Sequence, residues 1–168
     1  MQFVDVEEDI AQHLRQGLRR LAKAVVVITA WDGAQRWAMT ATAVSELSMD
    51  PPSLLVCVNR TASLYAPLVA RATFCVNILH ADQLPVAQAC SGAVKGEARF
   101  AQGHWEAGAC GTPYLVEAQA NFFCRFETIL EHGTHAVVIG AVQDVRVSAD
   151  VDPLVYVDGG YARVAKPA

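Results

Sequence analysis

The chain has 168 residues, a formal net charge of −4 and 53% hydrophobic residues, which is enough apolar surface for the core of one domain. The negative charge argues against nucleic acid as a partner, because it provides no basic field to attract a polyanion. The longest strongly apolar runs, residues 24–30 and 136–142, are far shorter than the roughly 20 residues that cross a bilayer, so we expect no membrane insertion.

The first ten residues are acidic and lack the apolar stretch and small-residue cleavage site of a secretory signal, so we expect a cytoplasmic protein. The cysteines also fit a reducing compartment, because they are odd in number, widely spaced and mostly set in apolar segments. We therefore expect reduced core thiols at these five positions: Cys57, Cys75, Cys90, Cys110 and Cys124.

Residues 7–22 are predicted to form an amphipathic helix, because Ile10, Leu14, Leu18 and Leu21 recur at spacings of four, four and three. Short β-branched runs separated by turn signals follow and predict one mainly β domain, an antiparallel sandwich or barrel. The expected strands are 24–30, 37–44, 54–59, 73–79, 122–130, 136–147 and 154–157, with short helices at 63–70 and 82–89.

Two later segments carry further information. Residues 91–111 hold five of the eleven glycines and few strong β-formers, which is typical of a long functional loop. The strand at 136–147 is apolar on both faces over residues 136–142. It is therefore either the middle of a barrel wall or a buried contact between subunits.

Several common enzyme motifs are missing from the sequence. No Gly-x-Gly-x-x-Gly follows a predicted strand, and there is no Walker lysine motif and no Gly-x-Ser-x-Gly elbow. His132 and His135 are spaced so that they could share a metal, but no carboxylate or cysteine nearby would complete the site. We therefore predict no metal.

Two segments are candidates for ligand binding. In residues 38–43 small side chains alternate with hydroxyls, which fits either a close-packed strand crossing or backbone amides open to a flat polar ligand. Thr61 and Ser63 stand between a predicted strand and a predicted helix, where they would either cap the helix or bind phosphate.

Taken in order, these segments resemble the short flavin reductases that supply reduced flavin to two-component monooxygenases, such as the 4-hydroxyphenylacetate hydroxylase reductase type. The resemblance covers about residues 12–164. The stretches that carry it are 38–43, 47–52, 54–59, 74–79, Arg99 with Phe100, 133–135 and 153–156.

The resemblance implies an FMN-binding split β-barrel with short flanking helices, covering about 24–164 of a single domain, 1–168. It also implies a homodimer with one flavin per subunit in a groove near the dimer contact. The expected reaction is hydride transfer from NADH, or alternatively NADPH, to FMN or FAD, with reduced flavin diffusing to a partner monooxygenase. Two other functions stay open: a flavin enzyme that reduces a corrinoid or a quinone, and a non-catalytic flavin or haem module.

The same resemblance assigns roles to individual residues. The isoalloxazine ring would lie along Trp37, Met39, Thr40, Ala41, Thr42 and Ala43, with its pyrimidine edge at Cys57, Val58 and Asn59. Cofactor contacts would also come from Arg60, Thr61, Ser63, Asn77, Arg99 and Phe100, with the phosphate near Thr61 and Ser63. His135, the expected catalytic residue, and Tyr161 would face the nicotinamide.

Hydride passes directly between the two rings in such enzymes, so placement matters more than a nucleophile. Backbone amides at 41–43 and 58–59 would then donate to the pyrimidine carbonyls. His135 differs from the family pattern in its neighbour, since Thr134 stands where many relatives have an acid. The other interpretation of His135 is a turn histidine bonded to a nearby carbonyl.

Overall fold

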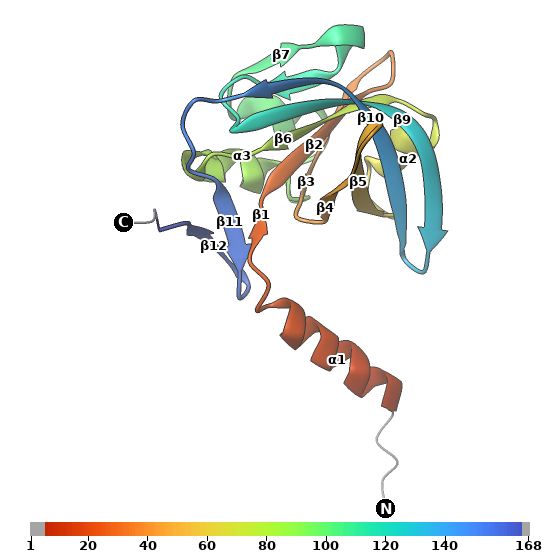
Figure 1. The fold of residues 1–168 in the computed structure, drawn as a ribbon, viewed down its shortest axis with the longest axis vertical. Coiled ribbons are helices and arrows are strands. Elements are labelled where there is room, and N and C mark those ends of the chain that lie inside the picture. The colour runs from red at the N-terminus through yellow and green to blue at the C-terminus, as the bar shows by residue number, and fades with distance from the viewer. Residues whose placement is uncertain (1–5, 166–168) are drawn as a thin grey trace, which may run out of the picture.

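The computed structural model describes residues 6–165, and antiparallel strands dominate it (Figure 1). Seven strands form the main sheet in the order β3-β2-β6-β9-β10-β5-β4. Smaller sheets have the orders β1-β11-β12 and β7-β8. The expectation of a mainly β fold with short flanking helices is confirmed.

The bounds of the elements are as follows. The main sheet contains β2 (Val26–Trp31), β3 (Arg36–Ala41), β4 (Val44–Met49), β5 (Pro52–Asn59), β6 (Thr73–Ile78), β9 (Ala120–His132) and β10 (His135–Val147). The smaller sheets contain β1 (Lys23–Ala24), β7 (Trp105–Ala107), β8 (Pro113–Leu115), β11 (Leu154–Val157) and β12 (Gly160–Arg163). The helices are α1 (Val6–Leu18), α2 (Tyr65–Val69) and α3 (Leu84–Ala89), with 3₁₀ turns η1 (Ala81–Gln83), η2 (Gly96–Ala101) and η3 (Ala109–Gly111).

The apolar core has two parts because strand β2 is buried on both of its faces. Ile28 packs with Val138 in one cluster, inside the curved main sheet. Val27 packs with Leu115 and Phe100 in the other, which also contains side chains of α3. With β2 fixed from both sides, its neighbour β3 becomes an edge strand whose outer side is open to the segment that follows α3.

Strands β9 and β10 form a long hairpin that depends on Gly140. The register of the hairpin shifts next to this residue, and such irregularities bend a strand. A Cβ at position 140 would lie 2.4 Å from Cζ of Phe74 and 2.9 Å from Cβ of Cys124. Glycine therefore allows the Phe74 ring to pack directly against β10 while the hairpin curves around the core.

The strand that is apolar on both faces has different surroundings on its two sides. Ala136 and Val138 are fully buried in the core, whereas Val137 and Ile139 are half-buried and reach the outer surface. One face is therefore barrel wall. The outer face keeps apolar side chains at the surface of the single chain.

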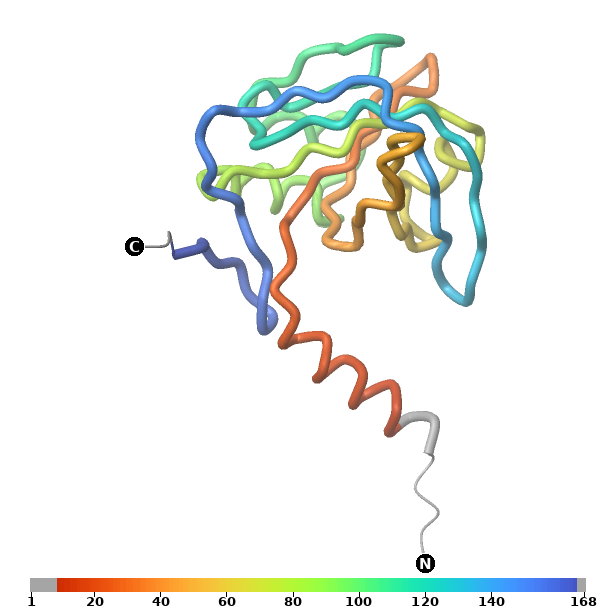
Figure 2. Tube along the Cα trace, in the orientation of Figure 1, coloured from red at the N-terminus to blue at the C-terminus, as the bar shows by residue number. Residues whose placement is uncertain are grey.

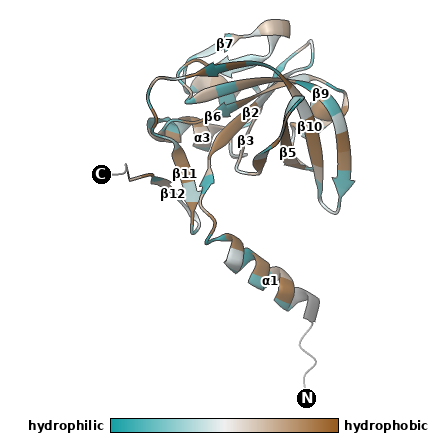
Figure 3. Ribbon diagram, viewed as in Figure 1, coloured by the Kyte–Doolittle hydropathy of each residue, from teal (hydrophilic) through white to brown (hydrophobic). Residues whose placement is uncertain are grey.

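Helix α1 projects away from the sheets, and its path is clear in the trace of Figure 2. The expected apolar stripe is present, but Ile10 and Leu14 are 62% and 60% exposed. Figure 3 shows this hydrophobic banding on a helix that stands clear of the body. We expected this stripe to pack against the body of the protein. Within one chain it does not, because Ile10 and Leu14 stay mostly exposed. The helix also ends at Leu18 rather than at residue 22.

Other differences from the sequence-based expectations are local. Residues 91–111 form not one open loop but a segment that contains η2, β7 and η3. The strands β4, β8 and β12 were not expected, because runs of only three to six residues give little periodic signal. No helix in residues 6–165 is long and apolar enough to cross a membrane.

Candidate functional site

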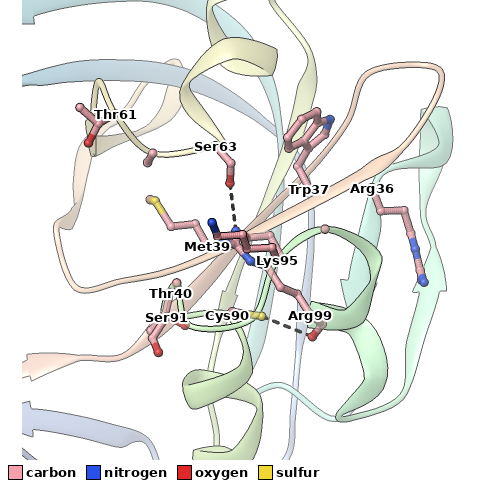
Figure 4. A pocket seen from close by; sticks show the side chains of 14 residues that line it. Arg36, Trp37, Met39, Thr40, Thr61, Ser63, Cys90, Ser91, Lys95 and Arg99 are labelled. Atoms are coloured by element: carbon pink, nitrogen blue, oxygen red, sulfur yellow. Dashed lines mark hydrogen bonds between the residues drawn. The ribbon is translucent and has the colours of Figure 1, made fainter.

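A cavity of about 600 Å³ lies between the edge of β3, the turn before α2, and the segment from Cys90 to Arg99 (Figure 4). Its volume is in the range of small-molecule sites, about 300–1,000 Å³. The lining residues are Arg36, Trp37, Ala38, Met39, Thr40, Thr61, Ala62, Ser63, Cys90, Ser91, Gly92, Lys95, Gly96 and Arg99.

The cavity is positively charged. Its described lining contains Arg36, Lys95 and Arg99 but no carboxylate. Arg36 is neutralised by Glu97, to which it donates, and its guanidinium lies 4.2 Å from the centre of the Phe100 ring. Among the side chains of residues 9–165, no carboxylate lies within 4 Å of Lys95 or Arg99. An anionic ligand would supply the missing counter-charge.

Arg99 is buried, with 9% of its surface exposed, and it braces three walls of the cavity. Its Nε donates to the Val94 carbonyl at 2.8 Å, which holds the segment from Cys90 to Arg99, the cavity loop. Its Nη1 donates to the Ala38 carbonyl at 2.5 Å and to Ser63 Oγ at 3.0 Å. Burying a cation is costly unless hydrogen bonds and an opposite charge compensate it. Arg99 has the hydrogen bonds, but the part of the chain that the structure describes supplies no carboxylate to match it.

The outer edge of β3 is bonded at Thr40 to the end of α3. The Thr40 N–H donates to the Cys90 carbonyl at 3.0 Å, and the Thr40 hydroxyl donates to the Ala87 carbonyl at 2.6 Å. The small side chains expected at 38–43 therefore do allow a close crossing. Because amides alternate along an edge strand, the N–H of Ala41 is directed to β2. This N–H therefore does not face the cavity, contrary to the expectation that the amides of residues 41–43 donate to the ligand.

Asn59 orders the turn that carries the two predicted hydroxyls. Its Oδ1 accepts from the N–H of Thr61 at 2.9 Å and from the Thr61 hydroxyl at 2.8 Å. Helix α2 has Leu64 at its N-cap and no side-chain capping bond. Neither Thr61 nor Ser63 caps the helix, so the capping interpretation is wrong, and both side chains line the cavity instead.

Trp37 is fixed at the cavity by the turn that precedes β3. Its indole N–H donates to Asp32 Oδ2 at 2.7 Å. The other oxygen of Asp32 accepts from the N–H groups of Ala34 and Gln35, at 2.8 Å each. The hydrogen bonds from Gln35, Ala34 and Trp37 lower the pKa of Asp32. The carboxylate is therefore charged at neutral pH and available to hold the indole.

Cys90 contributes an inert wall. Its thiol is buried and directed at the Arg99 carbonyl, 3.7 Å away. Burial raises the pKa of Cys90 to about 11, so the protonated form prevails at neutral pH. A nucleophile or metal ligand would need the thiolate, and Cys90 does not provide it.

Three residues expected to contact the ligand belong to the interior instead. Asn77 is fully buried, and its side chain bonds to the Val27 carbonyl, the Leu115 N–H and the Asn121 amide. It joins β2, β8 and β9 and does not line the cavity. Val58 and Phe100 are core residues. Hydrogen bonds inside the protein satisfy Asn77, and packing in the core buries Val58 and Phe100, so none of the three side chains is left open to a ligand.

The other expected residues lie around the cavity without lining it. His135 is exposed at the start of β10, with its Nδ1 2.8 Å from the Thr134 hydroxyl, and it pairs in register with Asn59. Arg60 bonds to the Glu131 carboxylate at 3.5 Å. Cys57 is half-buried, and its N–H donates to the Ala43 carbonyl at 2.9 Å.

Two expected residues lie near the base of α1. Tyr161 packs edge to face against Tyr156 in the β11–β12 hairpin, with ring centres 5.3 Å apart. Thr42 lines two further hollows, of about 340 and 480 Å³, which also contact Leu21 and Lys23. Strand β3 therefore lines the cavity, and Thr42, just after it, lines both hollows.

The sequence alone did not single out several lining residues, chiefly Arg36, Cys90, Ser91 and Lys95. Three of the four precede or lie in the glycine-rich segment. Its composition was the only available signal. Gly92 and Gly96 have φ values of 115° and 60°, which glycine adopts without strain. These turns place Lys95 at the cavity.

Comparison with known proteins gives consistent results. Residues 18–165 match the family model described as flavin reductase like domain. The chain is 42% identical over 163 residues to the reductase component of an FADH(2)-dependent resorcinol hydroxylase from Rhizobium sp. (strain MTP-10005), covering 96% of this chain and 90% of that protein. It is 36% identical to the FMN reductase (NADH) RutF of Variovorax paradoxus (strain S110), covering 91% and 85%.

Solved structures agree with this result. The NADH:FAD oxidoreductase SgcE6 of Streptomyces globisporus C-1027, in complex with NAD and FAD fragments, superposes with a TM-score of 0.88 at 26% identity, covering 100% of this chain and 99% of that one. BorF, the flavin reductase component of a bacterial two-component tryptophan halogenase, gives 0.85 at 29% identity, covering 94% and 99%. The expected split-barrel fold is confirmed.

Proposed function

The chain belongs to the flavin reductase-like family, and from this membership we propose that it oxidises NADH to reduce FMN or FAD and supplies the reduced flavin to a partner monooxygenase. One observation in the structure carries the assignment: a cavity of about 600 Å³ with a buried arginine that the described side chains leave without a carboxylate within 4 Å. FMN and FAD carry phosphate, which would provide that charge.

The residues present fit a flavin. Ser63 and Thr61 offer hydroxyl groups to the cavity, Ser63 in contact with the Arg99 guanidinium, and Lys95 adds a second cation. Trp37 and Met39 offer flat and apolar surface along β3. A phosphate bonded to Ser63 and Lys95, close to the charge of the Arg99 guanidinium, would leave the ring system to lie along β3.

When bound, a flavin accepts hydride at its ring system from a reduced nicotinamide. The task of the chain is then placement, since a fixed geometry of two reactants contributes much of the barrier lowering. Arg99 holds the loop, β3 and Ser63 together, and Asp32 holds Trp37. The cavity walls are thus rigid before a ligand binds.

Steady-state oxidation of NADH and NADPH with FMN, FAD and riboflavin tests this function. We expect flavin-dependent oxidation that is faster with NADH than with NADPH. Tight flavin binding with NADH oxidation no faster than that of free flavin would replace the proposal with a non-catalytic binding module. Turnover only with a corrinoid or a quinone added would change the acceptor.

We also propose that the protein works as a homodimer in the cytoplasm. The exposed stripe of α1 and the outer face of β10, with Val137 and Ile139, are apolar surfaces that a second copy would cover. A stable contact of this kind buries more than roughly 2,000 Å² in total. Cys75, Cys90 and Cys124 are buried thiols as expected, whereas Cys57 is half-buried and Cys110 is exposed rather than in the core. Widely spaced thiols of this kind fit a reducing compartment. Sedimentation as a monomer at micromolar concentration with full activity would refute the dimer.

A further inference from the structure

Ser63 and Arg99, which both line the cavity, are joined by a direct hydrogen bond. Ser63 lies on the exposed turn before α2, and Arg99 is buried at the end of the cavity loop. Figure 4 shows the two side chains joined across the cavity. The bond between them is 3.0 Å long, from Arg99 Nη1 to Ser63 Oγ.

The direction of this bond determines whether the hydroxyl proton of Ser63 remains free to be donated. A serine hydroxyl has one proton to donate and two lone pairs, and a guanidinium can only donate. Ser63 Oγ must therefore be the acceptor. Within residues 6–165, this is the one hydrogen bond recorded for the Ser63 side chain. Its proton has no acceptor in the described protein and remains available to a ligand in the cavity.

Three of the five N–H donors of the Arg99 guanidinium bond to the protein. The one proton on Arg99 Nε goes to the Val94 carbonyl, and the two on Nη1 go to the Ala38 carbonyl and to Ser63. These three contacts fix the plane of the guanidinium. The hydroxyl is thereby held in place by a buried positive charge, and donation to an anion strengthens when the donor is polarised in this way.

We propose that Arg99 is a positioning residue, which holds the Ser63 hydroxyl so that its O–H donates to the flavin phosphate. This inference rests on the proposed function, since the phosphate is that of the flavin. It separates two roles: Ser63 touches the phosphate, and Arg99 sets the direction and strength of the Ser63 contact. A lysine at position 99 would keep the charge but lose the planar arrangement of donors.

The test compares FMN with riboflavin, which lacks the phosphate. Dissociation constants are measured by quenching of flavin fluorescence for the wild-type protein, Ser63→Ala, Arg99→Lys and the double variant. Ser63→Ala should weaken FMN about 10-fold or more, as expected for a charge-assisted hydrogen bond, and riboflavin by less than about twofold. Ser63→Thr, which keeps a hydroxyl, should restore most of the FMN affinity.

The double variant decides the role of Arg99. If Arg99 acts through Ser63, Arg99→Lys should weaken FMN strongly in the wild-type background. In the Ser63→Ala background, Arg99→Lys should weaken the binding of FMN no more than it weakens the binding of riboflavin. Equal losses of FMN affinity in both backgrounds would overturn the proposal, because Arg99 would then act independently of Ser63. A loss shared equally by FMN and riboflavin would also overturn it and leave Arg99 a structural brace.

A second pair of variants keeps the proposal testable if Arg99→Lys fails to fold. Ser63→Asp places a carboxylate against Arg99, and Ser63→Asn is its neutral counterpart of similar shape. At pH 7 we expect a higher Tm for Ser63→Asp than for Ser63→Asn, together with loss of FMN binding and retained riboflavin binding. An equal or lower Tm would show that Arg99 does not face position 63. NADH oxidation is measured separately, so a failure of the reductase activity is distinguished from a failure of the Arg99 role.

Discussion

The cavity wall and helix α1 are opposite kinds of structure in the same chain. The wall is braced internally, since Arg99 alone bonds to β3, to its own loop and to Ser63. Helix α1 projects from the body with Ile10 and Leu14 mostly exposed. Isolated helices of about this length are marginal in water. The difference indicates that one chain suffices to shape a ligand cavity, whereas the apolar stripe of α1 stays uncovered within one chain and would be covered by the second copy that we propose.

Substitutions in the apolar stripe of α1 test most directly whether this helix forms a contact between two chains. Leu14→Glu with Leu18→Glu should raise the dimer dissociation constant at least about 100-fold, because burying each leucine contributes about 1.5–3 kcal/mol. The dissociation constant of FMN per chain should change little. Analytical ultracentrifugation and flavin titration measure the two quantities.

The control for this variant lies on the other side of the same helix. Gln12→Glu with Gln16→Glu adds the same charge at exposed positions away from the stripe. It should leave the dimer intact. Equal dissociation by both double variants would assign the effect to charge rather than to the apolar face.

Lys95 tests whether the charge of the cavity is used. Lys95→Gln removes a lining cation that has no carboxylate partner in residues 6–165. We expect FMN to bind about 10-fold more weakly, with a smaller dependence of its affinity on salt. Riboflavin affinity should change little. Arg125→Gln, an exposed site on β9, is the charge-matched control, and an equal effect there would point to net charge alone.

His135 tests how far the functional region extends beyond the cavity. It does not line the cavity, but it lies opposite Asn59, which orders Thr61. His135→Ala should leave FMN affinity nearly unchanged and lower kcat/KM for NADH about 10-fold, equivalent to about 1.4 kcal/mol of transition-state stabilisation. His132→Ala, across the same turn, should have little effect. Weakened flavin binding with unaltered NADH kinetics would instead place His135 at the flavin.

The sequence allowed most strands to be predicted, because their apolar periodicity is local. β2, β5, β6, β9, β10 and β11 all lie at or near the expected positions. The part of the cavity that runs through Trp37, Met39, Thr61 and Ser63 was expected from the family resemblance, and the structure brings these residues together. That they contact a flavin stays a prediction.

What could not be predicted depends on long-range contacts. Lys95 reaches the cavity because Arg99 and two glycine turns fold its loop back on β3, and no local pattern encodes that return. Asn77 was expected to contact the ligand from the family resemblance alone. Its partners come from β2, β8 and β9, which are far apart in sequence. Only the folded arrangement shows that it is already satisfied.

The smallest expected effect concerns Asp32, which holds Trp37 from outside the cavity. The lowered pKa of Asp32 lies below its value in the unfolded chain. Its contribution to stability is therefore fully present above the unfolded value of about 3.9 and is lost as the pH falls through the lower folded pKa. From pH 8 to pH 5, this group should cause no change in FMN affinity.

Removing the charge of Asp32 should have a modest effect at neutral pH. Asp32→Asn keeps acceptors for the backbone N–H groups but weakens the bond to the Trp37 indole, because charge-assisted bonds are the stronger ones. We expect FMN affinity to fall only about twofold, since the site is exposed and solvent-screened. Asp150→Asn, between β10 and β11, is the matched control. A loss of 10-fold or more would mean that Trp37 depends on this bond for its position, so that the turn belongs to the braced wall of the cavity.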